Sequence, residues 1–278
     1  MATIVGVPGA GHYRPGADHD RDNAARTRRW AKSLADGLGR DPADVDLVLA
    51  PYARHLHTAT PRQHGSGVDE LPDDARSMLI DLLDAMALPG ATAHGRLTVP
   101  LRHAVAMAAD SLGLDGRLTD LFVAVFFREL ATYLQHPNSP RRLAARGAVA
   151  EAIRAHTPDA VIAHSLGTVT VFEALHEHPE LEVGCLITLG SPLALQGAVF
   201  PRLVPGPVDD VIARPPGVAR WVNVSDPGDL VTIARPFTRY FPEVDVDVDE
   251  CIGLFDFHHA VNYLRCTAVA AELKPLIL

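Results

Sequence analysis

Residues 159–175 read DAVIAHSLGTVTVFEAL, and this stretch decides the fold. Its first half is a short run of small and apolar residues, and its second half has the composition of a helix. Between them lies A-H-S-L-G, in which Ala163 and Gly167 stand two positions before and after Ser165. A strand that turns sharply into a helix leaves little room for side chains at those two positions. The pattern therefore predicts a serine held on a tight turn between a buried strand and a helix.

A simpler interpretation of the same residues is an ordinary strand-to-helix connection in which Ser165 caps the helix. The tight-turn interpretation has a chemical consequence that the simpler one lacks. It makes the hydroxyl of Ser165 project above the edge of the sheet, where the helix N-terminus favours developing negative charge. Residues elsewhere in the chain must decide between the two.

On either side of this stretch, apolar runs of strand length alternate with helical patterns. We expect strands at 4–7, 45–50, 160–163, 183–189 and 221–225, and helices at 22–38, 140–155, 166–178 and 259–273. Such alternation is typical of a parallel sheet covered by helices. The predicted fold class is therefore α/β, with a mostly parallel central sheet flanked by helices.

The alternation lapses between residues 66 and 136, where helical patterns cover 72–87, 100–112 and 117–135. The last pattern is apolar almost all round, which indicates burial on several sides. We interpret 66–136 as a helical cap inserted into a single domain of residues 1–278. Phe122 and Phe126 of this segment could line an apolar channel, or they could simply pack the inserted helices onto the main body.

The composition excludes several classes of protein. The chain has 278 residues, of which 47% are hydrophobic and 21% charged, as in soluble globular proteins. No apolar run reaches the ~20 residues of a membrane helix, and the N-terminus reads as a strand rather than a signal peptide. We therefore expect no integral membrane association. The net charge of −9 and the lack of a basic stripe argue against nucleic-acid binding.

Cysteine and acidic residues carry no metal or disulfide pattern. Cys185, Cys251 and Cys266 lack CxxC spacing and are expected to be small core residues in a reducing, cytoplasmic protein. The aspartates of VDVDVD at 244–249 indicate an edge strand with a solvated acidic face, because the carboxylates of a calcium site converge from a turn. The histidines between residues 55 and 64 share a loop without the spacing of a zinc site. We expect neither a metal nor an organic cofactor.

With three later motifs, the serine motif resembles the α/β-hydrolase superfamily, in particular its lipase-like and esterase-like branches. These motifs are T-L-G-S-P at 188–192, W-V-N-V-S-D-P-G-D-L-V at 221–231 and D-F-H-H-A-V-N-Y-L at 256–264. They place a serine, an acid and a histidine in the order that this fold uses. The chain departs from the family pattern at Ala163, where glycine is frequent, and at Pro8-Gly9, where His-Gly commonly follows the first strand.

The resemblance implies an acid after the strand at 221–225. Asp226 and Asp229 both qualify. The family pattern of an aspartate directly before a hydrophobic residue and a valine favours Asp229, and Asp226 then caps its turn.

It also implies a histidine before the last helix, and both His258 and His259 qualify. A histidine five residues before a tyrosine is frequent in the family, and His258 has that spacing to Tyr263. The resemblance therefore favours His258.

In the mechanism that the resemblance implies, His258 removes the proton of Ser165 as the hydroxyl attacks an acyl carbon, and Asp229 stabilises the charged imidazole. The oxyanion would receive hydrogen bonds from the backbone N–H groups of Leu166 and Ala10. The residues expected to contact the substrate are Gly9, Gly11, His12, Phe122 and Phe126.

The predicted function is a serine hydrolase, such as an esterase, lipase-like enzyme or thioesterase, acting on a small-molecule ester or thioester of an apolar acyl group. An alternative is an acyltransferase or cyclase that passes the acyl group to an alcohol or amine, which a dry pocket favours. A second alternative is a ligand-binding protein whose triad is idle, because Pro8 replaces the usual histidine of the oxyanion loop. The oligomeric state stays open.

Overall fold

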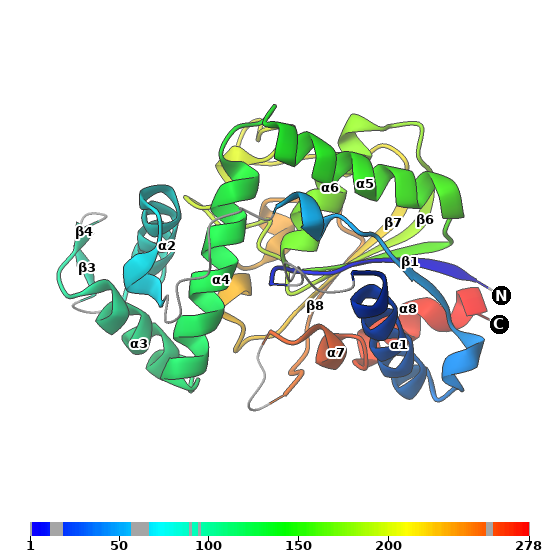
Figure 1. The fold of residues 1–278 in the computed structure, drawn as a ribbon, viewed down its shortest axis with the longest axis horizontal. Helices are drawn as coiled ribbons and strands as arrows, with labels where there is room; N and C mark the ends of the chain where they lie inside the picture. Colours follow the sequence, from blue (N-terminus) through cyan, green and yellow to red (C-terminus); the bar gives the residue numbers. More distant parts are fainter. Residues whose placement is uncertain are drawn as a thin grey trace.

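The computed structural model describes residues 2–11, 19–56, 67–88, 91–93, 96–253 and 258–277, and it shows a central sheet with helices on both faces (Figure 1). The sheet has six strands in the order β2-β1-β5-β6-β7-β8, and every neighbouring pair is parallel. The strands are β1 (Thr3–Val7), β2 (Asp46–Leu49), β5 (Ala160–His164), β6 (Val183–Leu189), β7 (Val218–Ser225) and β8 (Val246–Asp249). The predicted α/β class with a parallel sheet is confirmed.

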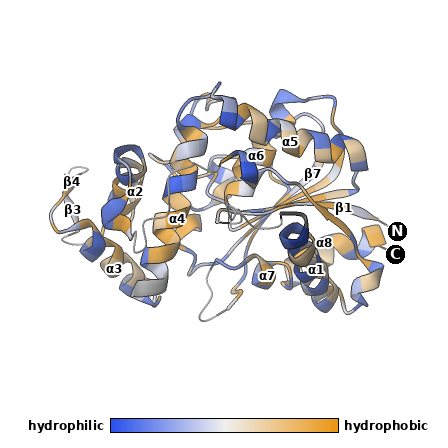
Figure 2. Cartoon of the chain, in the orientation of Figure 1, coloured by the Kyte–Doolittle hydropathy of each residue, from blue (hydrophilic) through white to orange (hydrophobic). Residues whose placement is uncertain are grey.

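Two hydrophobic cores lie on opposite faces of the sheet. One face carries α1 (His19–Leu38), α7 (Ala260–Tyr263) and α8 (Thr267–Ile277), and the other carries α5 (Pro140–His156) and α6 (Leu166–Glu177) (Figure 1). Successive strand residues alternate between the cores, so Val161 packs with α5 and α6 while Ile162 packs with α1 and α8. Both faces of the inner strands are buried, which fits the nearly continuous apolar sequences of β1, β5 and β6 (Figure 2).

The expected closing helix at 259–273 is two helices with a break between Tyr263 and Thr267, so that prediction was wrong in detail. The break lets α1 approach closely, because a Cβ on Gly37 would lie 3.0 Å from the Cα of Arg265. The carboxylate of Glu250 accepts hydrogen bonds from the N–H groups of Thr267 and Ala268, at 2.7 and 3.0 Å. Glu250 thereby caps the first backbone N–H groups of α8, which allows a separate helix to begin at Thr267.

Between β2 and α5 the chain forms α2 (Asp73–Ala85), the two-residue strands β3 (Thr92–Ala93) and β4 (Arg96–Leu97), α3 (Leu101–Ser111) and α4 (Gly116–Leu134). The three helices match the predicted patterns closely, whereas the small hairpin was not predicted. In Figure 1, α2 and α3 lie away from the sheet, and α4 stands between them and the main body. Most of α4 is buried as expected, but Leu121 is 59% exposed.

Short 3-10 helices cover Pro42–Asp44, Ala53–His55, Val68–Glu70, Phe200–Arg202, Leu230–Thr232 and Phe237–Arg239. Ser139 caps α5, since its side chain accepts a hydrogen bond from the N–H of Arg142. Among the described helices, none combines the length and apolar character needed to cross a membrane.

A buried polar network joins α4 to the main body. The carboxylate of Glu173, on α6, accepts hydrogen bonds from Tyr133 Oη of α4 at 2.7 Å and from Arg142 Nε of α5 at 2.9 Å. Both Glu173 and Arg142 are fully buried, and the Arg142 guanidinium also lies over the Tyr133 ring, 5.1 Å from its centroid. Arg146 brings a second guanidinium within 3.8 Å of the same carboxylate. Because α6 begins beside Ser165, this network connects the inserted helices to the helix behind the candidate site.

Candidate functional site

Ser165 lies on a strained turn between β5 and α6. Its backbone has φ 54° and ψ −130°, which residues with a Cβ rarely adopt. Its N–H donates to Leu189 O at 3.0 Å, and its carbonyl accepts from Thr168 Oγ1 at 2.7 Å. A Cβ on Gly167 would lie 2.5 Å from Pro8 O, so only glycine fits this approach. The Ser165 side chain makes no helix-capping hydrogen bond, and the simpler capping interpretation therefore does not describe this turn.

A chain of hydrogen bonds links Ser165, His258 and Asp229. His258 Nε2 lies 2.7 Å from Ser165 Oγ, and His258 Nδ1 lies 2.6 Å from Asp229 Oδ2. The Asp229 side chain is fully buried, and that of His258 is 5% exposed. With a proton on Nδ1, the imidazole donates to Asp229 and accepts from the serine hydroxyl. This is the geometry in which a histidine can remove a proton from a nucleophilic hydroxyl.

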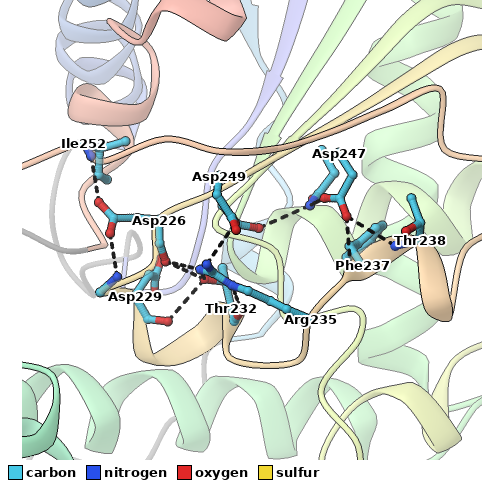
Figure 3. Close-up of polar contacts among 12 residues, drawn as sticks. Asp226, Asp229, Thr232, Arg235, Phe237, Thr238, Asp247, Asp249 and Ile252 are labelled. Atoms are coloured by element: carbon cyan, nitrogen blue, oxygen red, sulfur yellow. Dashed lines mark hydrogen bonds and ion pairs between the residues drawn. The ribbon is translucent and has the colours of Figure 1, made fainter.

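The two alternative residues lie beside this chain and are engaged differently. His259 is exposed and occupies the position before the first turn of α7. Asp226 Oδ1 accepts from Gly228 N, and its Oδ2 accepts from Ile252 N, both at 2.7 Å (Figure 3). The first of these bonds caps the turn, as the sequence suggested. The structure therefore brings Asp229 and His258 to Ser165, rather than Asp226 and His259.

Tyr263 is a member of the cluster to which the sequence assigned no role. Its hydroxyl donates to Asp229 Oδ2 at 2.7 Å and accepts from Asp226 N at 3.0 Å. Burial, followed by the charge of Asp229, raises the pKa of Tyr263 well above its usual range, so the hydroxyl keeps its proton. The one feature of the sequence that involved Tyr263 was its spacing from His258, and this spacing was used only to choose between His258 and His259.

Gly190, in the T-L-G-S-P motif, is a second missed residue. It has φ +53°, and a Cβ there would lie 3.0 Å from Asp229 Oδ2, 3.0 Å from Tyr263 Cε2 and 3.2 Å from His258 Cε1. A position without a side chain is therefore what allows these three groups to converge. The motif itself was the available signal, since a glycine directly after a buried strand indicates a close approach.

The loop after β1 passes directly against the serine. A Cβ on Gly9 would lie 2.7 Å from Ser165 Cβ and 3.0 Å from His164 Nδ1. Ala10 is half-buried and Gly11 is exposed, with φ +78°. Leu166, the other expected oxyanion donor, is buried as the first residue of α6. His12, which was expected to contact the substrate, lies outside the described residues.

Tyr52 holds the loop after β1 in place through a hydrogen bond. Its buried hydroxyl donates to Pro8 O at 2.6 Å. Burial, with a smaller contribution from Glu129, raises the pKa of Tyr52 well above its usual range, so this donor keeps its proton. This hydrogen bond holds the Pro8 carbonyl where the chain leaves β1.

Aromatic side chains enclose the His258 ring. The ring centroid lies 4.7 Å from that of Phe122, 6.3 Å from that of Phe126 and 4.7 Å from that of His164. Phe126 is buried in the main core, whereas Phe122 is half-buried. Both phenylalanines come from α4, which therefore forms the apolar side of the site. His164 is buried beside the turn.

The cysteines divide into two kinds, which corrects the prediction that all three lie in the core. Cys185 and Cys266 are buried, but Cys251 is exposed. Burial raises the pKa of Cys185 to about 12 and that of Cys266 to about 11. Both buried side chains therefore stay protonated thiols, which are poor nucleophiles and poor metal ligands.

The aspartates around β8 lie on an edge strand and are exposed, as predicted, and each of them also binds a hydrogen-bond donor or a guanidinium. The Asp245 carboxylate accepts hydrogen bonds from Trp221 N and from the Arg214 guanidinium. Asp247 accepts hydrogen bonds from Asn223 and from Phe237 N, and Asp249 pairs with Arg235 (Figure 3). Within the described part of the chain, no group of three or more His, Cys, Asp or Glu side chains could hold a metal ion. Of the histidine loop, His57 and His64 lie outside that part.

Comparison of the chain with protein-family models, with curated proteins and with solved structures finds no match in any of the three. What the chain does must therefore be inferred from the chemistry of its own residues.

Proposed function

We propose that the chain is a serine hydrolase of the α/β-hydrolase type, which cleaves an ester or thioester of an apolar acyl substrate. The observation that carries this proposal is the hydrogen-bonded chain from Ser165 through His258 to Asp229, with contacts of 2.7 and 2.6 Å. The strained backbone of Ser165 supports it, because such strain persists where function requires it.

In the first half-reaction, His258 Nε2 accepts the proton of Ser165 Oγ as that oxygen bonds to the acyl carbon. Asp229 accepts the hydrogen bond of His258 Nδ1–H and stabilises the imidazolium. The tetrahedral oxyanion receives hydrogen bonds from the N–H groups of Leu166 and Ala10, and the N-terminus of α6 favours its charge. The imidazolium then protonates the leaving alcohol or thiol, which leaves an acyl group on Ser165.

In the second half-reaction, water attacks the acyl carbon and gives its proton to His258. Collapse of the second tetrahedral intermediate breaks the bond to Ser165 Oγ, which recovers its proton from His258, and the carboxylic acid is released. No other reactant is needed.

The surroundings of His258 favour an apolar acyl group. Phe122 and Phe126 pack against the imidazole, and a Cβ on Gly11 would lie 3.3 Å from Val125 of the same helix. A charged acyl chain on this side would lose its hydration without gaining a partner from these three side chains.

Acyl transfer to an alcohol or amine is the second candidate function. Ser165 is 1% exposed, so little of the serine is in contact with solvent before a substrate binds. A site closed to water favours transfer of the acyl group over its hydrolysis.

Reaction with p-nitrophenyl esters of increasing chain length tests the proposal and separates the two candidates. We expect a burst of about one equivalent of nitrophenol, with the acyl group recovered on the Ser165 peptide after an acid quench. Continued release after the burst indicates hydrolysis, and a stall that added alcohols or amines relieve indicates transfer. The absence of burst, turnover and acyl-Ser165 across the whole series would contradict both.

Replacing Gly190 by alanine is expected to lower the acylation rate by roughly a hundredfold, because displacing reacting groups by about 1 Å has that effect. The added Cβ would press on Asp229, Tyr263 and His258 together. The rate of p-nitrophenol release in the burst measures the effect.

Gly113→Ala is the matched control for this substitution. Gly113 also has a positive φ, of +70°, but a Cβ there would meet nothing within 4 Å. It should therefore carry the same kind of backbone strain while leaving the acylation rate unchanged. Equal rates for the two variants would show that the space at Gly190 does not hold the cluster together.

A further inference from the structure

The Asp229 carboxylate accepts hydrogen bonds from three donors. Oδ2 accepts from both His258 Nδ1 and Tyr263 Oη, and Oδ1 accepts from Val231 N at 2.9 Å. Tyr263 thus binds the same oxygen that serves His258. We propose that Tyr263 is a positioning residue. Its hydrogen bond offsets part of the Asp229 charge that acts on His258, and it thereby lowers the pH at which Ser165 becomes reactive. This inference rests on the proposed function.

The Tyr263 hydroxyl is held in this role by its own surroundings. It accepts a hydrogen bond from Asp226 N, so its proton points to Asp229 rather than back to the loop. Its ring is buried, and the bare backbone of Gly190 lies against the ring edge. The hydroxyl therefore has no other orientation that satisfies both Asp226 N–H and Asp229.

The electrostatic consequence follows from the shared oxygen. Each donor on a carboxylate offsets part of its negative charge, and that charge is what stabilises the imidazolium form of His258. In a buried site this effect is stronger than in water. With Tyr263 present, less of the Asp229 charge is available to stabilise the imidazolium that forms when His258 takes the serine proton.

Removing only the Tyr263 hydroxyl leaves the other ionisable groups around the cluster chemically unchanged, and it takes away the acceptor of the Asp226 N–H. His164 of β5 packs 4.7 Å from the His258 ring and 5.8 Å from the Tyr263 ring, centroid to centroid. The Asp226 carboxylate is bound by Gly228 N and Ile252 N, and Arg235 binds Asp226 O and pairs with Asp249 (Figure 3). His259 is exposed. A change in the pH profile of a variant at 263 therefore reports on the hydroxyl itself.

The test measures the rate of Ser165 modification by a fluorophosphonate in the intact protein, over roughly pH 5 to 9. For Tyr263→Phe we expect the midpoint of the rising limb of the pH–rate profile to move up by about half a pH unit or more. Tyr133→Phe is the matched control, because it removes a buried hydroxyl that donates to the Glu173 carboxylate, also at 2.7 Å. That variant should show no shift.

A second variant keeps the test decisive if Tyr263→Phe does not fold. Site-specific 3-fluorotyrosine at position 263 retains the ring, and its hydroxyl is a stronger hydrogen-bond donor. The midpoint of the pH–rate profile should therefore move in the opposite direction, to lower pH. If Ser165 still reacts, two results overturn the role of Tyr263. One is an unchanged midpoint of the pH–rate profile in either folded variant, and the other is a midpoint at lower pH in Tyr263→Phe. A wild-type protein that does not react at any pH overturns the proposed function, and this inference with it.

Discussion

Replacing His258 by alanine is expected to slow acylation of Ser165 by about 10⁴- to 10⁶-fold, since the serine then has no base to take its proton. Ser165→Ala lacks the nucleophile and cannot be labelled, and it should lower kcat/KM for ester cleavage by about as much. The double variant should be no slower than either single variant, because the two residues act as one unit. The quantity to measure is kcat/KM for the best p-nitrophenyl ester, or the fluorophosphonate labelling rate where turnover is too slow.

His259→Ala is the matched control for this prediction, because His259 is the next residue in the chain. His259 is exposed, whereas His258 contacts both Ser165 and Asp229. We expect His259→Ala to react within about threefold of wild type, as surface substitutions usually change little. A larger loss in His259→Ala than in His258→Ala would contradict the arrangement of the site.

Replacing Glu173 by glutamine is expected to lower the free energy of unfolding by about 3–5 kcal/mol, the largest stability effect we predict. The substitution leaves the guanidinium of Arg142 fully buried without its counter-charge, and it removes one of the two carboxylates that lie within 4 Å of the Arg146 guanidinium. Urea denaturation followed by circular dichroism measures the change.

Two further variants show whether the buried charge is the cause. Glu180→Gln breaks an exposed pair with Arg154 and should shift the urea midpoint far less. Combining Glu173→Leu with Arg142→Met removes both charges, and should recover much of the stability, because Arg146 keeps Glu177 at 3.1 Å. A double variant as unstable as Glu173→Gln would mean that packing, and not the unpaired charge, sets the cost.

Local patterns in the sequence were sufficient to predict the sheet and the turn. Continuous apolar runs identify strands that are buried on both faces, and the small residues around Ser165 indicate the close passage of β1, β5 and α6. The order of Ser165, Asp229 and His258 along the chain pointed to the cluster that the structure contains. Each of these signals lies within a few neighbouring residues.

The features that were missed depend on contacts between distant segments. Nothing in the helix 259–273 pattern shows that Glu250 caps a second helix or that Gly37 makes room for the break. The hydrogen bond of Tyr263 to Asp229 and the space that Gly190 leaves beside them exist only in the folded chain. The two-residue strands of the hairpin are too short for any periodicity to register.

The choice between neighbouring residues also needed the fold. Asp226 and Asp229 follow the same strand, and their types and spacing suit either role. The fold separates them, because Asp226 binds the N–H of Ile252 while Asp229 binds His258. Likewise the aspartates of β8 have the composition of a solvated face, but the loop at Phe237 and the side chain of Arg235 supply donors to them.

Peptide mapping of a fluorophosphonate adduct tests the nucleophilic role of Ser165 most directly, since this reagent needs an activated serine and no knowledge of the substrate. The expected result is one phosphonyl group per chain, on the peptide that contains Ser165, absent from Ser165→Ala and from protein unfolded in urea. No adduct on the folded protein, or an adduct on a neighbour such as Ser191, would contradict the proposed function.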